Sequence, residues 1–202
     1  MKIVFATKNE GKVREIKEML DSMDVELMSL NHFESVPEIV EDGKTYLENA
    51  LKKAKIISEF TGETVLADDS GLEVDALGGE PGIYSARYAG EGATDDENNA
   101  RLLDKLKRVS PNERTASFCC ALVLYEKGGN HHSFEARWQG RIIDVSRGEN
   151  GFGYDPIFLC PAFNKTAAEL PPEIKNKVSH RGQAFAKLKE YLILQNNEMI
   201  GA

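Results

Sequence analysis

The stretch Val65-Leu66-Ala67-Asp68-Asp69-Ser70-Gly71-Leu72 joins an apolar run to two adjacent carboxylates, a hydroxyl and a glycine. The apolar run is typical of a buried strand. Carboxylates next to such a strand are costly unless a cation or hydrogen bonds compensate their charge. Because ligands of α/β sheets bind just beyond the carboxyl ends of strands, the pattern predicts that the strand ends here, at a binding site.

The size and charge of the chain limit the classes of protein to which it can belong. Its 202 residues can bury a sizeable core, in one large domain or two lobes. Hydrophobic residues make up 41% and charged residues 29%, as in soluble globular proteins. The net charge of −8 argues against a broad surface for nucleic acid or anionic membranes. The chain also has no run of about 20 apolar residues that could span a bilayer. We therefore expect no nucleic-acid partner and no membrane partner.

The cysteines indicate the compartment in which the chain works. Cys119, Cys120 and Cys160 all lie in apolar runs, and their odd number resembles neither a disulfide framework nor a zinc site. We therefore expect buried free thiols and a reducing cytoplasm. The segment from Lys2 to Ala6 is too short for a signal peptide and predicts a first strand.

A turn rich in hydrogen-bonding groups follows this first strand. Thr7, Asn9 and Lys12 supply a hydroxyl, an amide and a cation, and the apolar spacing predicts a helix from about Asn9 to Ser22. Such a strand–loop–helix unit directs free N–H groups and the positive end of the helix to one point, which suits a phosphate. An ordinary helix cap with a solvated lysine is the alternative that this pattern leaves open.

The remaining pattern predicts an α/β fold with a long mixed sheet and flanking helices. Capping boxes at residues 45–48 and 94–97 predict two helices, the first of which carries Lys53. Taken alone, this lysine is typical of a solvated helix face. Strands at 134–138 and 141–145, joined near Gly140, follow the central run 115–125 without helices and indicate an antiparallel part of the sheet.

Two polar segments in the last third of the chain are candidates for base recognition. Gly148 to Pro156 places glycines around Phe152, Tyr154 and Asp155, so that backbone and aromatic faces can approach a planar base. A tight turn stabilised by its own aromatic residues is the alternative. The segment 179–181 at the start of the last helix suits anion or carbonyl recognition, or plain capping.

Together, the cation-bearing loop, the carboxylates and the glycine-aromatic loop predict a magnesium-dependent nucleotide site. A nucleotide-binding module with little turnover is one alternative. A phosphohydrolase with an aspartyl nucleophile is another, although such enzymes usually carry Asp-x-Asp, whereas the two aspartates are adjacent here. A small structural α/β protein would leave the three polar loops unexplained.

Six motifs, in one order along nearly the whole chain, resemble those of the noncanonical purine nucleoside triphosphate pyrophosphatases, also called inosine triphosphate pyrophosphatases. The motifs are Thr7–Lys12, Glu41–Gly43 with Glu48–Ala50, Ala67–Leu72, Gly78–Tyr88, Gly151–Pro156 and Ser179–Gly182. Their joint occurrence is highly specific. At Lys8 the chain departs from many relatives, which have glycine there.

The resemblance implies hydrolysis of inosine, deoxyinosine and xanthosine triphosphates (ITP, dITP and XTP) to the monophosphate and pyrophosphate, with Mg²⁺ as cofactor. It implies that residues 1–202 form one elongated α/β domain of two lobes, with the active site in the cleft between them. A homodimer is also implied.

The resemblance further implies roles for individual residues. The phosphate-binding residues are Thr7, Lys8, Asn9, Glu10, Gly11, Lys12 and Lys53. The metal-binding carboxylates are Glu41 and Asp69, with Asp68 as a possible further ligand and Glu38 as a rival to Glu41. Asp69 is also the proton acceptor. The remaining substrate contacts are Ser70, Phe152, Gly153, Tyr154, Asp155, Lys175, His180 and Arg181.

Two hypotheses follow from the chemistry of these residues. Adjacent residues of an extended strand point to opposite faces, so Asp68 and Asp69 can both reach one metal only if the strand ends or bulges near Gly71. A cation such as Arg181 can donate to the 6-oxo group of inosine or xanthosine, whereas the 6-amino group of adenine would face it as a second donor.

Overall fold

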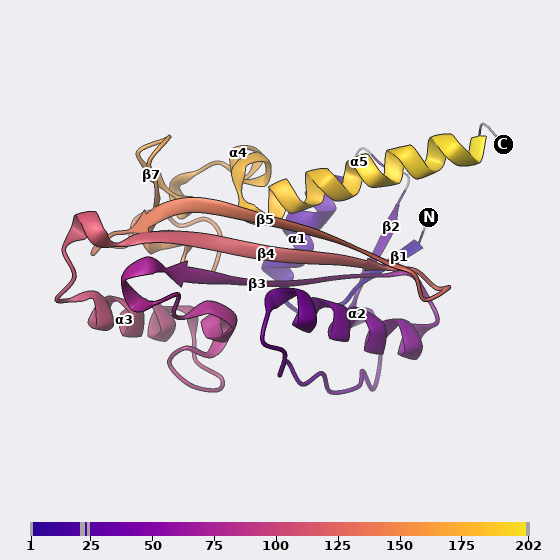
Figure 1. Ribbon diagram of the computed structural model, residues 1–202, viewed down its shortest axis with the longest axis horizontal. Helices are drawn as coiled ribbons and strands as arrows, with labels where there is room; N and C mark the ends of the chain where they lie inside the picture. Colours follow the sequence, from indigo (N-terminus) through magenta and orange to yellow (C-terminus); the bar gives the residue numbers. More distant parts are fainter. Residues whose placement is uncertain (1, 21–22, 24, 201–202) are drawn as a thin grey trace. The chain divides into compact units, whose positions relative to one another are not determined.

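The computed structural model describes residues 2–20, 23 and 25–200 (Figure 1). Its strands are β1 (Lys2–Phe5), β2 (Glu26–Ser29), β3 (Val65–Val74), β4 (Thr115–Tyr125), β5 (His131–Ile142), β6 (Phe158–Cys160) and β7 (Lys165–Thr166). Its α-helices are α1 (Glu10–Leu20), α2 (Tyr46–Thr61), α3 (Asp95–Leu106), α4 (Pro172–Val178) and α5 (His180–Ile200). The predicted helix end at Ser22 lies outside the described residues.

The strands form a seven-stranded sheet in the order β2-β1-β3-β4-β5-β6-β7. β1 pairs in parallel with β2 and β3, whereas β6 pairs antiparallel with β5 and β7. The prediction of an α/β fold with a mixed sheet is therefore confirmed. Phe5 lies beside Leu66 in the register, so the loop that follows β1 begins next to the acidic residues of β3.

The chain groups into two compact units, each built from several segments. The first unit consists of Met1–Asp69, Cys120–Ala136 and Arg181–Ala202, and the second of Ser70–Cys119 and Arg137–His180. Strands β3, β4 and β5 contribute residues to both units, which explains why the sequence shows no boundary. Among the helices of the described residues, none has the length and apolar character needed to cross a membrane.

In the first unit, the two faces of the strands pack against different helices, because successive residues of a strand point to opposite sides. Leu66 packs on one face with Ile16 of α1 and Leu188 of α5. Ala67 packs on the other face with Ile57 of α2. Figure 1 shows α2 and α5 along opposite sides of these strands.

In the second unit, an aromatic cluster forms the centre of the core. The ring of Phe158 on β6 lies 4.5 Å from that of Phe118 on β4 and 5.2 Å from that of Trp138 on β5, measured between ring centres. Leu102 and Leu106 from the buried face of α3 belong to the same cluster. The capping box that predicted α3 is present, with both hydrogen bonds between Thr94 and Glu97.

The prediction that the strand ends at the carboxylates is wrong. β3 continues from Val65 through Asp68 and Asp69 to Val74. Its second half remains extended because Leu72 and Val74 belong to the buried core of the second unit. The carboxylates therefore lie in the middle of a strand, so their compensation must come from neighbouring side chains.

The two strands predicted on either side of Gly140 are one strand, β5. A Cβ atom at Gly140 would lie 2.5 Å from the ring of Phe158 and from the Leu159 carbonyl oxygen. The glycine thus permits close packing of β5 and β6 and marks no turn. The turn lies before β5, where the Glu126 N–H donates to the Asn130 carbonyl over 2.8 Å.

Candidate active site

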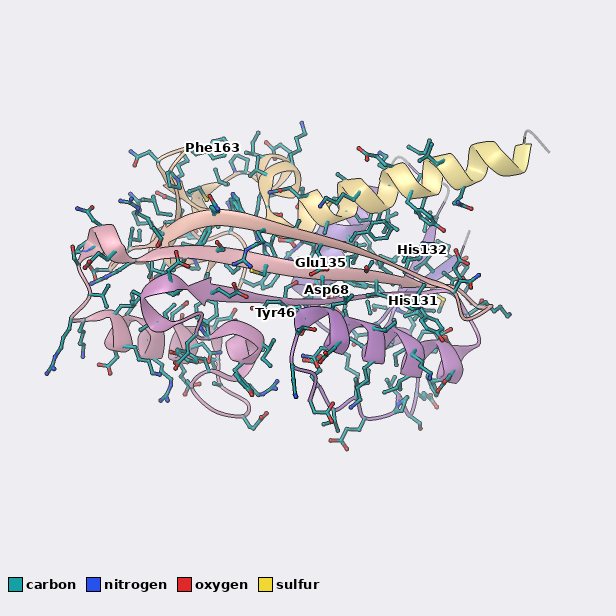
Figure 2. The ribbon with its side chains drawn as sticks, viewed as in Figure 1. Tyr46, Asp68, His131, His132, Glu135 and Phe163 are labelled. Atoms are coloured by element: carbon teal, nitrogen blue, oxygen red, sulfur yellow. The ribbon has the colours of Figure 1, made fainter. Side chains whose placement is uncertain are left out.

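Asp68 and Asp69 lie on opposite faces of β3, with only 1% and 7% of their surfaces exposed (Figure 2 labels Asp68). Asp68 lies on the face of Leu66, toward α1 and α5, and Asp69 on the face of Ala67, toward α2. The two carboxylates therefore have separate partners, although they are neighbours in the chain.

On the first face, two cations compensate Asp68. The Lys12 ammonium lies 3.0 Å from Oδ1 and 2.9 Å from Oδ2, and Arg181 donates to Oδ2 from Nη2 over 3.2 Å and from Nε over 3.3 Å. Arg181 also donates from Nη1 to Glu15 over 2.5 Å. Burial alone would raise the pKa of Asp68, but Lys12 and Arg181 outweigh it and hold that pKa well below its ordinary value.

On the opposite face, two residues of α2 approach Asp69. Asn49 Nδ2 donates to Asp69 Oδ2 over 3.0 Å. Lys53, one helical turn later and therefore on the same side of α2, donates to the Asp68 carbonyl oxygen over 3.1 Å. The Lys53 ammonium also lies 2.5 Å from a carboxylate oxygen of Glu41. This face thus joins two carboxylates, an amide and an ammonium.

Burial and mutual repulsion set the protonation behaviour of this group. Burial raises the pKa of Asp69 above its ordinary value, and the Glu41 carboxylate adds to the rise, while Lys53 and Asn49 oppose it. For Lys53, burial favours the neutral amine, but Glu41, Asp68 and Asp69 outweigh burial and raise the pKa of the ammonium. Lys53 therefore stays charged although it is only 8% exposed.

The loop after β1 is held by its own polar side chains. The Asn9 N–H donates to Thr7 Oγ1 and the Lys12 N–H donates to Asn9 Oδ1, each over 3.1 Å, so Asn9 caps α1. The cap expected under the simpler alternative is therefore present, but the Lys12 ammonium is bound to Asp68 and not merely solvated. The remaining predicted residues of this loop are the exposed Lys8 and Glu10 and the half-buried Gly11.

A hollow of about 450 Å³ opens beside this loop in the first unit. Its polar wall contains Thr7, Lys8, Glu38, Glu41 and Lys53, and its apolar wall contains Ala6, Leu30, Val36, Pro37 and Ile39. Of the two rival glutamates, Glu41 is the one that pairs with Lys53, whereas Glu38 is exposed at the wall. The hollow thus brings three of the predicted phosphate-binding residues, Thr7, Lys8 and Lys53, together with Glu41.

Glu41 and Asp69 fit a divalent cation better than Asp68 does. Mg²⁺ prefers carboxylate oxygens and is usually held by one or two carboxylates together with substrate phosphates. The repulsion between Glu41 and Asp69 is of the kind that a cation relieves, whereas both oxygens of Asp68 already accept from cationic side chains. In the part of the chain that the structure describes, no group of three or more His, Cys, Asp and Glu side chains is arranged to hold a metal ion.

In the second unit, the glycine-aromatic loop folds around Asp155, which is 3% exposed. This carboxylate accepts from the Phe152 N–H over 3.0 Å and from Lys175 of α4 over 2.6 Å. The Lys175 ammonium also lies 5.1 Å from the centre of the Phe152 ring, a cation–π contact. At Gly151, whose φ is +80°, a Cβ atom would collide with Asp155, so this tight turn requires glycine.

Two residues of α3 hold the tip of the same loop. The Gly153 N–H donates to Asp95 over 2.6 Å, and Asn99 donates to the Gly153 carbonyl oxygen over 3.0 Å. Tyr154 is 4% exposed and donates to the Ser85 carbonyl oxygen over 2.8 Å. Because Tyr154 is buried in the core, the half-buried Phe152 is the ring of this loop that offers a stacking face.

The last predicted residues adjoin two points of the sequence at which one unit ends and the other begins, after Asp69 and after His180. Ser70 follows Asp69 in β3 and is half-buried. His180 begins α5, is 5% exposed, and stacks on Phe118 with 4.8 Å between ring centres. Arg181 comes next in the chain but belongs to the first unit, where it binds Asp68 and Glu15. The contact of Arg181 with the base remains a prediction.

The predicted residues thus form one group in each unit. Two polar residues of the first group were not among the predicted site residues: Glu15, and Asn49, which lies within the motif Glu48–Ala50 but was given no role. Asn49 lies four residues before Lys53 on the buried side of α2, and Glu15 lies three residues after Lys12 on α1. In each case the signal was a polar side chain at helical spacing from a predicted cation.

The mixed α/β fold and the lysine–carboxylate pairs define a class of α/β proteins suited to polyphosphates and a divalent cation. The Ham1 family model matches residues 3–191, and the chain belongs to the Ham1 family. The dITP/XTP pyrophosphatase of Geobacter sulfurreducens is 52% identical over 197 residues, which are 98% of this chain and 99% of the relative. That of Desulforamulus reducens is 50% identical over 95% of this chain and 96% of the relative.

Solved structures agree with this assignment. The structure of a HAM1 protein from Coxiella burnetii superposes with a TM-score of 0.86 at 42% identity, covering 96% of this chain and 98% of the other. A nucleoside-triphosphatase / dITP/XTP pyrophosphatase from Mycobacterium abscessus gives a TM-score of 0.75 at 44% identity, covering 93% and 98% of the two chains.

Proposed function

We propose that this protein is a hydrolase that cleaves noncanonical purine nucleoside triphosphates (ITP, dITP and XTP) into the monophosphate and pyrophosphate. Its family and the names of its relatives support this reaction. The observation that carries the proposal is the group of Asp69, Glu41 and Lys53, where two carboxylates meet a buried ammonium beside the hollow.

Residues Thr7–Lys12 and Lys53 bind the phosphate groups in this proposal. The ammonium groups of the lysines in this set stabilise the negative charge that builds on the departing pyrophosphate. Lys12 is already held by Asp68, and Lys53 by Glu41. Because these cations are fixed before substrate arrives, little reorganisation is needed during the reaction.

Glu41 and Asp69 would hold Mg²⁺, while Asp68 supports the site from the opposite face of β3. When bound, Mg²⁺ neutralises charge on the triphosphate and makes water easier to deprotonate. Asp69 orients the attacking water and accepts its proton, which its raised pKa favours over that of an exposed aspartate. The hydrogen bond from Asn49 to Oδ2 fixes the orientation of this carboxylate.

The nucleoside is bound, in this proposal, by Ser70, Phe152–Asp155, Lys175, His180 and Arg181. Phe152 offers a ring to the base and Asp155 holds Lys175 beside that ring. A hydrogen-bond donor near position 6 of the base can bond to the oxygen of a 6-oxo purine. The same donor disfavours adenine, because the 6-amino group would leave two donors facing each other.

The setting of the reaction is also part of the proposal. We place the enzyme in the cytoplasm, as a homodimer, with no nucleic-acid or membrane partner. The three buried free thiols are compatible with a reducing compartment.

Initial rates with ITP, dITP, XTP, GTP and ATP at equal Mg²⁺ concentration test the proposal. We expect turnover of ITP and XTP to exceed that of ATP by about 100-fold or more, because the unmatched donors penalise adenine. Chelation of Mg²⁺ by EDTA should abolish turnover. Equal rates with ATP and ITP would contradict the substrate assignment, and tight ITP binding without turnover would favour a nucleotide-binding module.

A further inference from the structure

We propose that Glu15 is a positioning residue, which holds Arg181 so that Asp68 fixes the ammonium of Lys12 toward the phosphate groups of the substrate. The inference rests on the proposed function, because it assigns Lys12 to phosphate binding. Glu15 itself has no direct part in binding or chemistry here.

Four side chains of alternating charge form a series of three ion pairs in the first unit. Lys12 pairs with Asp68 at 2.9 Å, Asp68 accepts from Arg181 at 3.2 Å, and Arg181 donates to Glu15 at 2.5 Å. Lys12 and Glu15 both come from α1, three residues apart and so on neighbouring positions of its surface. The series therefore starts and ends on one helix and passes through β3 and α5.

Burial makes each charge of the series depend on its neighbours. Asp68 and Arg181 are 1% and 2% exposed, and the side chains of Glu15 and Lys12 are 12% and 16% exposed. Two positive and two negative charges cancel. A buried ion that loses one partner leaves an uncompensated charge, which is far more costly than the loss of an exposed ion pair.

Competition for one oxygen atom links Glu15 to Lys12. Two N–H groups of Arg181 donate to Oδ2 of Asp68, and the same oxygen lies 2.9 Å from the Lys12 ammonium. Glu15 accepts a hydrogen bond from a third nitrogen of Arg181, Nη1. Without the Glu15 charge, Arg181 depends more strongly on Asp68, and Lys12 loses its share of that carboxylate and its fixed position.

Neutralising Glu15 changes the affinity for anions in opposite directions, depending on whether Glu15 positions Lys12 or acts only through its charge. If Glu15 acted only through its long-range charge, its neutralisation would leave the site more positive and strengthen the binding of an anion. If Glu15 positions Lys12, neutralisation weakens anion binding, because the ammonium is no longer held in place. The two accounts therefore predict opposite signs for one measured affinity.

The test compares Glu15→Gln with Glu18→Gln, which removes the same charge from an exposed position of the same helix. Inorganic pyrophosphate is titrated into each protein by calorimetry, and KM and kcat are measured with ITP. We expect Glu15→Gln to raise the Kd for pyrophosphate and the KM for ITP about tenfold, as for one lost charge-assisted hydrogen bond, with a smaller change in kcat. Glu18→Gln should match the wild type.

Unchanged or tighter pyrophosphate binding by Glu15→Gln contradicts the inference while leaving the proposed function intact. Absence of pyrophosphate binding by the wild type contradicts the phosphate assignment itself, and the inference with it. If Glu15→Gln does not fold, Glu15→Asp keeps the charge on a side chain shorter by one methylene. Glu15→Asp should also weaken the binding of pyrophosphate, by a smaller factor than Glu15→Gln. Unchanged or tighter pyrophosphate binding by Glu15→Asp would contradict the inference.

Discussion

Asp68 and Asp69 are chemically identical neighbours whose surroundings make them different groups. Asp68 accepts from Lys12 and Arg181, which keep its pKa low and the carboxylate ionised. Asp69 accepts from the neutral amide of Asn49 and has a raised pKa because it is buried. Asp69 is therefore the better proton acceptor of the two, and Asp68 is better suited to positioning cations.

At this scale, Asp69→Asn is expected to reduce turnover of ITP by about 10²–10⁴-fold, the usual contribution of a general base. Binding of ITP should be largely retained, because Lys12 and Lys53 keep their charges. The matched control is Asp42→Asn, which removes an exposed carboxylate that pairs with Lys52 at 2.5 Å. Turnover near the wild-type level for Asp69→Asn would remove it as the base.

The roles within the acidic stretch could be predicted only in part from the sequence. The cluster of polar residues and the family resemblance pointed to Asp69, and strand alternation predicted that an uninterrupted strand would separate it from Asp68. The partners that distinguish the two could not be deduced, since Lys12 and Arg181 lie 56 and 113 residues away from Asp68. Such contacts depend on tertiary packing, which local patterns do not encode.

At the scale of elements, local signals succeeded for helices and failed for β5. The box at Thr94 and Glu97 forms as predicted, because it involves residues three apart. At Thr45 only one half forms, since Glu48 accepts from the Lys44 N–H. Gly140 resembles a turn residue in the sequence, but its role is to admit Phe158, a residue of another strand.

Gly140→Ala is accordingly expected to destabilise the protein by about 1–3 kcal/mol, as overpacking of a filled core does. Gly128→Ala serves as the control, since a Cβ atom there would have no other atom within 4 Å. The free energy of unfolding is measured for both variants by urea denaturation. A Gly140→Ala protein as stable as the Gly128→Ala protein would contradict the packing role assigned to this glycine.

At the scale of the whole molecule, all three cysteine thiols are buried. Cys119, Cys120 and Cys160 are free and buried, as their apolar surroundings in the sequence predicted. Burial raises the pKa of the Cys160 thiol to about 12, and the Asp155 carboxylate adds to the rise. The reactive thiolate of Cys160 is therefore scarce at neutral pH.

Titration with a thiol reagent such as DTNB at pH 8 checks this expectation. The native protein should show almost no fast reaction, and all three thiols should react once the chain is unfolded in guanidinium chloride. Raising the pH to 9 should add little, because it remains far below the raised pKa of Cys160. Rapid reaction of a thiol in the native protein would show that its burial does not protect it.

The most direct test of the central claim is identification of the products formed from ITP by phosphorus-31 NMR, in the presence of Mg²⁺. Our account predicts inosine monophosphate and pyrophosphate in equal amounts from the first turnover, because the lysines stabilise a leaving pyrophosphate. Inosine diphosphate together with orthophosphate as the first products would contradict it.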